Sequence, residues 1–200
     1  MRETAKRLID SDCWRYLGRS GSHARLRLEQ MGFRYTTVLR KVQSHPTGLS
    51  HYWYRLRLLR LSKETGFQIG AGAQVDAGLF IGHRGTVIVN GKARLGSNVN
   101  LSPGVVIGQE NRGTRIGVPR LGNRVWVGSN AVIVGNVRIG NDVLVAPNAY
   151  VNFDVPDHSI VISNPARVIR RADATEGYCH NLVPNLVPDA EYAVGEGSRR

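Results

Sequence analysis

The chain has 200 residues, of which 42% are hydrophobic and 21% charged, so it can form one domain with a buried core and a smaller appendage. Its two cysteines, Cys13 and Cys179, lie far apart, which excludes a disulfide framework and a structural zinc site. The net charge of +12 is concentrated in residues 1–65, with 14 Lys and Arg against 5 Asp and Glu, and this spread is more typical of a solvated face than of a nucleic-acid-binding surface.

Residues 1–65 are expected to be helical. Helices are predicted at 5–11, 24–31, 35–42 and 49–61, separated by Gly18, Gly21, Gly32 and the stretch 46–48. The last helix is both aromatic and basic, with Trp53 between tyrosines and Arg55 close behind. Peripheral contact with anionic lipid is one expectation for it, and packing against an open end of the following domain is the favoured one. No apolar run reaches the roughly 18 to 20 residues that span a bilayer, and a cytoplasmic location is expected.

Residues 66–171 show an internal repeat of six residues. Twelve aliphatic residues mark the repeat: Ile69, Val75, Ile81, Leu95, Leu101, Ile107, Leu121, Val127, Ile133, Ile139, Val145 and Val151. Seven of the twelve are followed directly by glycine. A period of six fits neither an amphipathic helix nor an alternating strand. It predicts a mainly β protein, a left-handed parallel β-helix in which three hexads close one coil and the aliphatic residue points inward.

Two insertions interrupt this rhythm, and each lengthens the step between aliphatic residues to 14, from Ile81 to Leu95 and from Ile107 to Leu121. The first follows Ile81 and contains His83; the second follows Ile107 and contains the polar, basic stretch 109–120. Such a stretch should loop out of the coil, and loops on a rigid scaffold often hold functional residues. The repeats end at Val151, a short segment returns at 162–170, and a flexible tail is expected over 172–200.

His83 is the candidate catalytic base. It lies in an insertion and is the only histidine between Tyr54 and Asp157. An alcohol is a poor nucleophile at neutral pH, and an imidazole can take its proton and later return it to a leaving group.

The hexads, the Gly-His of the first insertion, the basic second loop and the stretch 164–167 resemble the serine acetyltransferase-like branch of the hexapeptide acyltransferases. The leader, with Trp14 and the run 32–35, is similar to that of family members among polysaccharide-biosynthesis enzymes. The resemblance implies a homotrimer with active sites between neighbouring solenoids, acetyl-CoA as co-substrate and no metal. It also implies that His83 deprotonates the acceptor hydroxyl.

The departures from the family pattern concern the acceptor. Gln68 stands where the family has the aspartate that orients the histidine, and Gly82 where it has an acidic contact to the substrate. The loop lacks the family's second histidine. A sugar or polysaccharide-precursor hydroxyl is therefore favoured over L-serine, the alternative acceptor, because serine's ammonium and carboxylate need partners. Glycine at position 82 is expected to leave room for a bulky acceptor, and the loop arginines to pair with a phosphate or carboxylate on it: Arg112, Arg115 and Arg120.

The resemblance also implies a set of acetyl-CoA contacts. They are Gly108 and Gln109 at the start of the loop, Trp126 and Ser129 one coil on, Pro147 in the next repeat, and Arg167 and Arg170 near the nucleotide end. The two arginines have a direct rationale, since guanidinium groups pair with phosphates. A γ-type carbonic anhydrase on the same fold is excluded, because it needs three histidines on a metal. A purely binding solenoid would not need either insertion.

Overall fold

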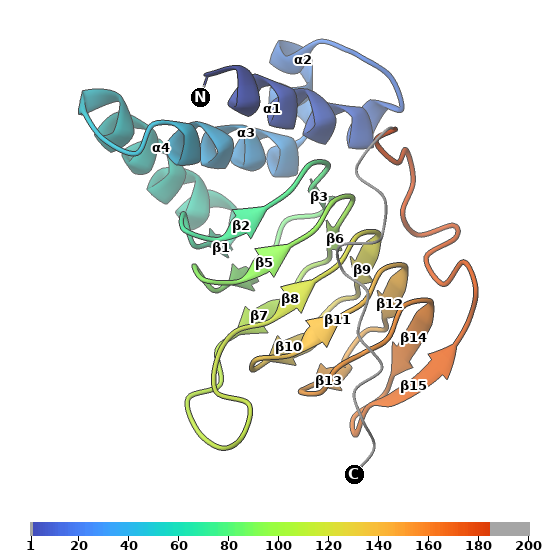
Figure 1. The fold of residues 1–200 in the computed structure, drawn as a ribbon. Helices are drawn as coiled ribbons and strands as arrows, with labels where there is room; N and C mark the ends of the chain where they lie inside the picture. The colour runs from blue at the N-terminus through green and yellow to red at the C-terminus, as the bar shows by residue number, and fades with distance from the viewer. Residues whose placement is uncertain (1, 185–200) are drawn as a thin grey trace.

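The computed structural model describes residues 2–184. A parallel β-helix forms most of it, and helices cover the N-terminal end of this solenoid (Figure 1). The described helices are α1 (Arg2–Leu17), α2 (His23–Glu29), α3 (Met31–Ser44) and α4 (Leu49–Thr65). The predicted parallel β-helix of hexapeptide repeats, preceded by a helical segment, is confirmed.

The solenoid has three faces, each a sheet of stacked short strands. Sheet A contains β1 (Phe67–Ile69), β4 (Val87–Val89), β7 (Val106–Gly108), β10 (Val132–Val134) and β13 (Tyr150–Val151). Sheet B contains β2 (Gln74–Val75), β5 (Arg94–Leu95), β8 (Arg120–Leu121) and β11 (Arg138–Ile139). Sheet C contains β3 (Phe80–Ile81), β6 (Asn100–Leu101), β9 (Val125–Val127), β12 (Val143–Val145), β14 (Ser159–Ile162) and the antiparallel β15 (Arg167–Arg170).

The six-residue step produces the core because each hexad forms a strand on one face and turns its aliphatic residue and the residue two positions earlier inward, as Val87 and Val89 do in β4. On sheet A, Ile69 pairs in register with Val89 and Val89 with Ile107, and all are buried. The corners between faces are tight. Gly104 has a φ of +81°, and a Cβ there would collide with the side chain of Asn130 in the next coil, so glycine is required at this bend.

Three of the four helices are longer than the apolar pattern predicts, whereas α2, expected at 24–31, spans His23–Glu29. The helix expected at 5–11 runs from Arg2 to Leu17 and ends at Gly18, whose φ is +67°. The helix at 49–61 packs on the solenoid's open end as expected, and it shares this end with α3. Helix α3 supplies Tyr35, Leu39 and Val42 to the continuous core, and α4 supplies Leu58 and Leu61.

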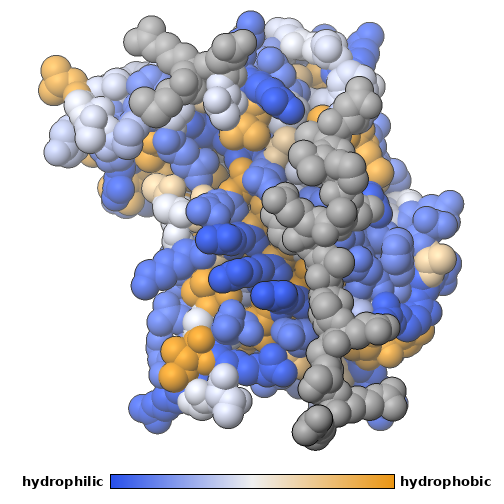
Figure 2. All heavy atoms as spheres, viewed as in Figure 1, coloured by the Kyte–Doolittle hydropathy of each residue, from blue (hydrophilic) through white to orange (hydrophobic). Residues whose placement is uncertain are grey.

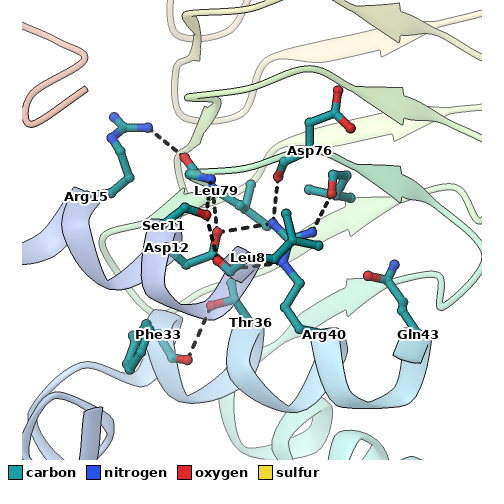
Figure 3. Close-up of polar contacts among 12 residues, drawn as sticks. Leu8, Ser11, Asp12, Arg15, Phe33, Thr36, Arg40, Gln43, Asp76 and Leu79 are labelled. Atoms are coloured by element: carbon teal, nitrogen blue, oxygen red, sulfur yellow. Dashed lines mark hydrogen bonds and ion pairs between the residues drawn. The ribbon is translucent and has the colours of Figure 1, made fainter. Parts of the chain in front are cut away.

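A buried ion pair joins the helices to the solenoid (Figure 3). The guanidinium of Arg40 on α3 donates to both carboxylate oxygens of Asp12 on α1, each at 3.1 Å, and neither side chain is exposed. Arg40 also donates to the backbone carbonyls of Val75 and Asp76, and Asp12 accepts from the backbone N–H of Leu79 at 2.9 Å. The pair therefore connects two helices to the first coil.

Residues 172–184 pack against the rest of the protein, in contrast to the flexible tail that the sequence predicts over 172–200. This segment turns back along sheet C toward α1 (Figure 1). Asn100 donates to the carbonyl of Tyr178 at 3.0 Å, and Trp14 donates to the carbonyl of Leu182 at 3.1 Å. The sequence gives little sign of this packing, because several of its contacts use backbone groups of the segment. The rest of the predicted tail lies outside the described residues.

Asp142 anchors the start of this segment. It is 3% exposed and accepts hydrogen bonds from the backbone N–H groups of Ala174 and Thr175 and from the Thr175 hydroxyl, while His158 Nδ1 lies 2.9 Å from its Oδ2. Burial opposes ionisation, but the hydrogen bonds from Thr175, His158 and Ala174 prevail and hold the pKa of Asp142 below its usual value.

We expect this carboxylate to make the stability of the protein depend on pH. A lowered folded-state pKa contributes stability that is complete above the unfolded value of about 3.9 and is lost as the pH falls through the folded value. The free energy of unfolding in urea, measured from pH 6 to pH 3, should therefore fall less steeply for Asp142→Asn than for the unchanged protein. Equal slopes would contradict the assignment.

Candidate active site

His83 lies at an edge of the solenoid, in the bend between β3 of sheet C and β4 of sheet A. Its side chain is exposed and makes no hydrogen bond or ion pair with residues 2–184. The bend is fixed by its backbone, because the N–H of Gly85 donates to the carbonyl of Thr65 at 3.1 Å. An exposed imidazole on a fixed bend is available to a bound substrate.

Several predicted contacts follow His83 along this edge. Ile81, Leu101, Val127 and Val145 are in register on sheet C. The corners that follow these strands succeed one another along the solenoid axis and carry His83 in the first coil, Pro103 in the second, Ser129 in the third and Pro147 in the fourth. The first corner is longer than the others, so Gly85 lies against Pro103, and a Cβ at Gly85 would be 3.0 Å from the Cβ of Pro103. Strands are spaced by about 4.8 Å, so successive corners are about this far apart along the axis.

Two further predicted contacts lie beside the same edge. A Cβ at Gly128 would meet the Trp126 ring at 2.7 Å, so this ring reaches toward the corner, and its other neighbour is Tyr178 at 4.9 Å between centroids. Arg167 is exposed and pairs in register with Ile162, which directly follows the inward Val161. The structure thus groups His83, Trp126, Ser129, Pro147 and Arg167 along one side of the solenoid.

Arg170 does not join this group. It lies at the other end of β15, opposite Ser159, and its Nη1 donates to the carbonyl of Asp157 at 2.6 Å. Sequence spacing alone could not separate Arg170 from Arg167, because the separation depends on which way β15 crosses sheet C.

Gln68 lies on the outer face of β1 and makes no hydrogen bond with His83. It lines a groove of about 550 Å³ between sheet A and α4, together with Leu59, Lys63 and Ile88. The expected orienting contact to the ring is therefore absent from the described residues.

Gly82 does not open the volume that the sequence suggests. A Cβ at this position would lie 3.0 Å from the Phe80 ring, so the ring occupies the space where a family member carries its acidic side chain. Phe80 is in turn packed against Tyr16 of α1, with ring centroids 4.5 Å apart. Sequence analysis missed Phe80, whose only signal was an aromatic residue one position before an inward hexad residue.

The second insertion forms a loop between β7 of sheet A and β8 of sheet B. An antiparallel bridge between Glu110 and Gly117 closes it, and Arg115 pairs with Asp154 at 3.5 Å. Gly108, Gln109 and Arg112 belong to this loop and its start, so they lie across sheet A from the edge that carries His83. Within one chain, these residues and His83 therefore lie at opposite edges of sheet A.

Arg120 lies outside the loop, on β8. It is in register with Arg94 and Arg138 on the outer face of sheet B, and all three are exposed. Figure 2 shows strongly hydrophilic side chains gathered over these strands. Arg120 is therefore part of a row of arginines and is separate from the edge of His83.

Among residues 2–184, no group of three or more His, Cys, Asp or Glu side chains is placed to hold a metal ion. No helix in this part of the chain is long and apolar enough to cross a membrane.

The chain is similar in sequence and in structure to known proteins. Residues 119–152 match the family described as bacterial transferase hexapeptide (six repeats). A serine acetyltransferase from Helicobacter pylori is 35% identical over 107 residues, which are 54% of this chain and 63% of the relative. Serine acetyltransferase 2 of Arabidopsis thaliana is 33% identical over 111 residues, 56% of this chain and 34% of the relative.

A solved serine acetyltransferase from Neisseria gonorrhoeae superposes with a TM-score of 0.66 and 25% identity, over 84% of this chain and 68% of that one. The chain thus spans between about a third and two thirds of the length of these curated relatives. In its repeats, its solenoid and these matches, the chain is similar to the hexapeptide-repeat acyltransferases.

Proposed function

We propose that the protein transfers the acetyl group of acetyl-CoA to an acceptor hydroxyl, with His83 as the general base. The observation that carries this proposal is an exposed His83 without a hydrogen-bond partner among residues 2–184, at the start of an edge that continues through Ser129 and Pro147 to Arg167. The relatives, all serine acetyltransferases by name, support the same chemistry.

In the proposed reaction, the His83 imidazole takes the proton of the acceptor hydroxyl as its oxygen attacks the thioester carbonyl carbon. The tetrahedral intermediate then collapses, the C–S bond breaks, and the imidazolium returns the proton to the departing thiolate. The two substrates exchange an acetyl group and a proton, and His83 ends as it began.

The edge fits a long, phosphorylated co-substrate. Arg167 lies at its far end, where a guanidinium can pair with a phosphate, and Trp126 beside Gly128 gives it a flat aromatic wall. The backbone groups of Ser129 and Pro147, at the corners of two successive coils, lie between Trp126 and Arg167. Gly108 and Gln109 can reach the edge only from another copy of the chain, because they lie across sheet A in their own.

The comparisons favour L-serine as the acceptor, since the relatives carry that name and the Neisseria gonorrhoeae structure contains serine. A sugar hydroxyl is a second candidate, and one observation supports it: Gly82 and the adjacent Phe80 ring offer no charge to serine's ammonium. We expect serine to be acetylated with a higher kcat/KM than neutral sugars and nucleotide sugars. Free thiol release from acetyl-CoA measures both, and the reverse ranking would support the second candidate.

We further propose that the active unit is a homotrimer. The outer face of sheet A carries Ile88, Val106 and Val132, all half-exposed, and the loop beside it is out of reach of its own His83. A neighbouring copy on this face would bury the aliphatic row and bring its loop to the edge. Light scattering should therefore give three times the chain mass, and an active monomer would contradict the proposal.

A further inference from the structure

Three helices of the N-terminal segment enclose a cavity that no strand of the solenoid lines. Its volume is about 560 Å³. The wall consists of one face each of α2, α3 and α4: Ala24, Arg27 and Leu28; Arg34, Thr37, Val38 and Lys41; Tyr54 and Arg57. The proposed acetyl-transfer edge does not use these residues.

The charged groups of this wall are all cations. Arg27, Arg34, Lys41 and Arg57 line it, and none of them forms an ion pair with a carboxylate among residues 2–184. Burial, followed by the charges of Arg27 and Arg57, lowers the pKa of Lys41. Four like charges around one cavity repel one another unless an anion lies between them.

Thr37 lines the same cavity, and its hydroxyl oxygen is buried just behind the cavity surface. The residue is 2% exposed, and its Oγ1 is a buried atom without a hydrogen-bond partner in the described chain. Its neighbour Thr36 shows the usual arrangement, with Oγ1 donating to the carbonyl of Phe33 at 3.2 Å. A buried hydroxyl without a partner is destabilising, so a ligand that accepts its hydrogen bond would relieve this cost.

We propose that this cavity binds a phosphate group, with Arg27, Arg34, Lys41 and Arg57 as its counter-charges and Thr37 as a hydrogen-bond donor. Phosphate suits the wall because it carries up to two negative charges and several acceptor oxygens, and guanidinium groups bind it through paired hydrogen bonds. Leu28 lies at the cavity and is 85% exposed, so a ligand with an apolar part beside its phosphate also fits. The source is either a soluble phosphate ester or the headgroup of an anionic lipid.

The first test is titration of the full chain with inorganic phosphate at constant ionic strength, followed by calorimetry. We expect saturable binding that weakens about tenfold in Thr37→Val, which loses one hydrogen bond to a charged group. The double variant Arg27→Gln/Arg57→Gln should bind more weakly still. Arg25→Gln is the matched control, because Arg25 lies on the same helix as Arg27 but pairs with Glu29 in solvent.

Thr37→Val also controls for folding. Without phosphate, it should be as stable as the unchanged protein or more so, since it removes an unpaired buried hydroxyl. Loss of binding in a stable variant then reports on the cavity alone.

Vesicles distinguish the two sources. Sedimentation with phosphatidylglycerol but not phosphatidylcholine vesicles, lost in the cavity variants and kept in Arg25→Gln, would identify a lipid headgroup. Binding of inorganic phosphate without vesicle binding would identify a soluble ester. The proposal is overturned if neither probe binds, or if Arg25→Gln weakens binding as much as the cavity variants.

Discussion

Replacing His83 with alanine should lower the turnover of acetyl transfer by about 10² to 10⁴, the usual contribution of a general acid–base group. The fold should be unaffected, because the imidazole is exposed and makes no hydrogen bond with residues 2–184. Steady-state thiol release, together with thermal unfolding and CoA binding of the same variant, separates lost chemistry from lost structure.

Gln68→Ala is the companion variant. Since Gln68 does not contact His83 and lines the groove beside α4, its loss should change turnover far less. If His83→Ala retains full activity, the base is another residue, and if Gln68→Ala is equally damaging, the two side chains act together in the bound complex.

Replacing Arg40 with methionine should have the largest effect on stability. The substitution leaves the Asp12 carboxylate buried without its partner and removes the bonds to the carbonyls of Val75 and Asp76. Breaking one side of a buried pair typically costs 3 to 5 kcal/mol, and urea unfolding should show about this loss. Arg60→Met is the control, because the Arg60–Glu64 pair is exposed on α4 and should contribute less than about 1 kcal/mol.

A double variant tests the reason for that loss. Replacing both Asp12 and Arg40 with apolar residues of similar size should recover part of the stability, since it removes the uncompensated charge. No recovery would mean that the connection between helices and solenoid depends on the hydrogen bonds to the backbone.

The solenoid could be predicted from sequence because its rule is local. Each inward residue such as Ile107 recurs at a fixed step, and the corner glycines follow from backbone geometry. The insertion around His83 was visible as a break in that step. Neither the solenoid nor this insertion required knowledge of side-chain contacts to be predicted.

The features that sequence missed depend on contacts between distant segments. The Asp12–Arg40 pair joins residues 28 positions apart, and the stretch that includes Tyr178 packs on sheet C through backbone carbonyls that have no sequence signal. Phe80 fills the space beside Gly82 because of its own orientation on the strand. Likewise, the sequence predicts that Arg120 belongs to the loop, whereas the register of sheet B pairs it with Arg94.

The most direct test of the central claim is identification of the acetylated product. The protein is incubated with acetyl-CoA and L-serine or a panel of sugars, and the product is analysed by mass spectrometry before and after treatment with hydroxylamine. We predict one added acetyl group that hydroxylamine removes, as for an ester, and far less product in the same time with His83→Ala. An acetyl group that resists hydroxylamine, and therefore lies on nitrogen, or the absence of product with every acceptor would contradict hydroxyl acetylation by this chain.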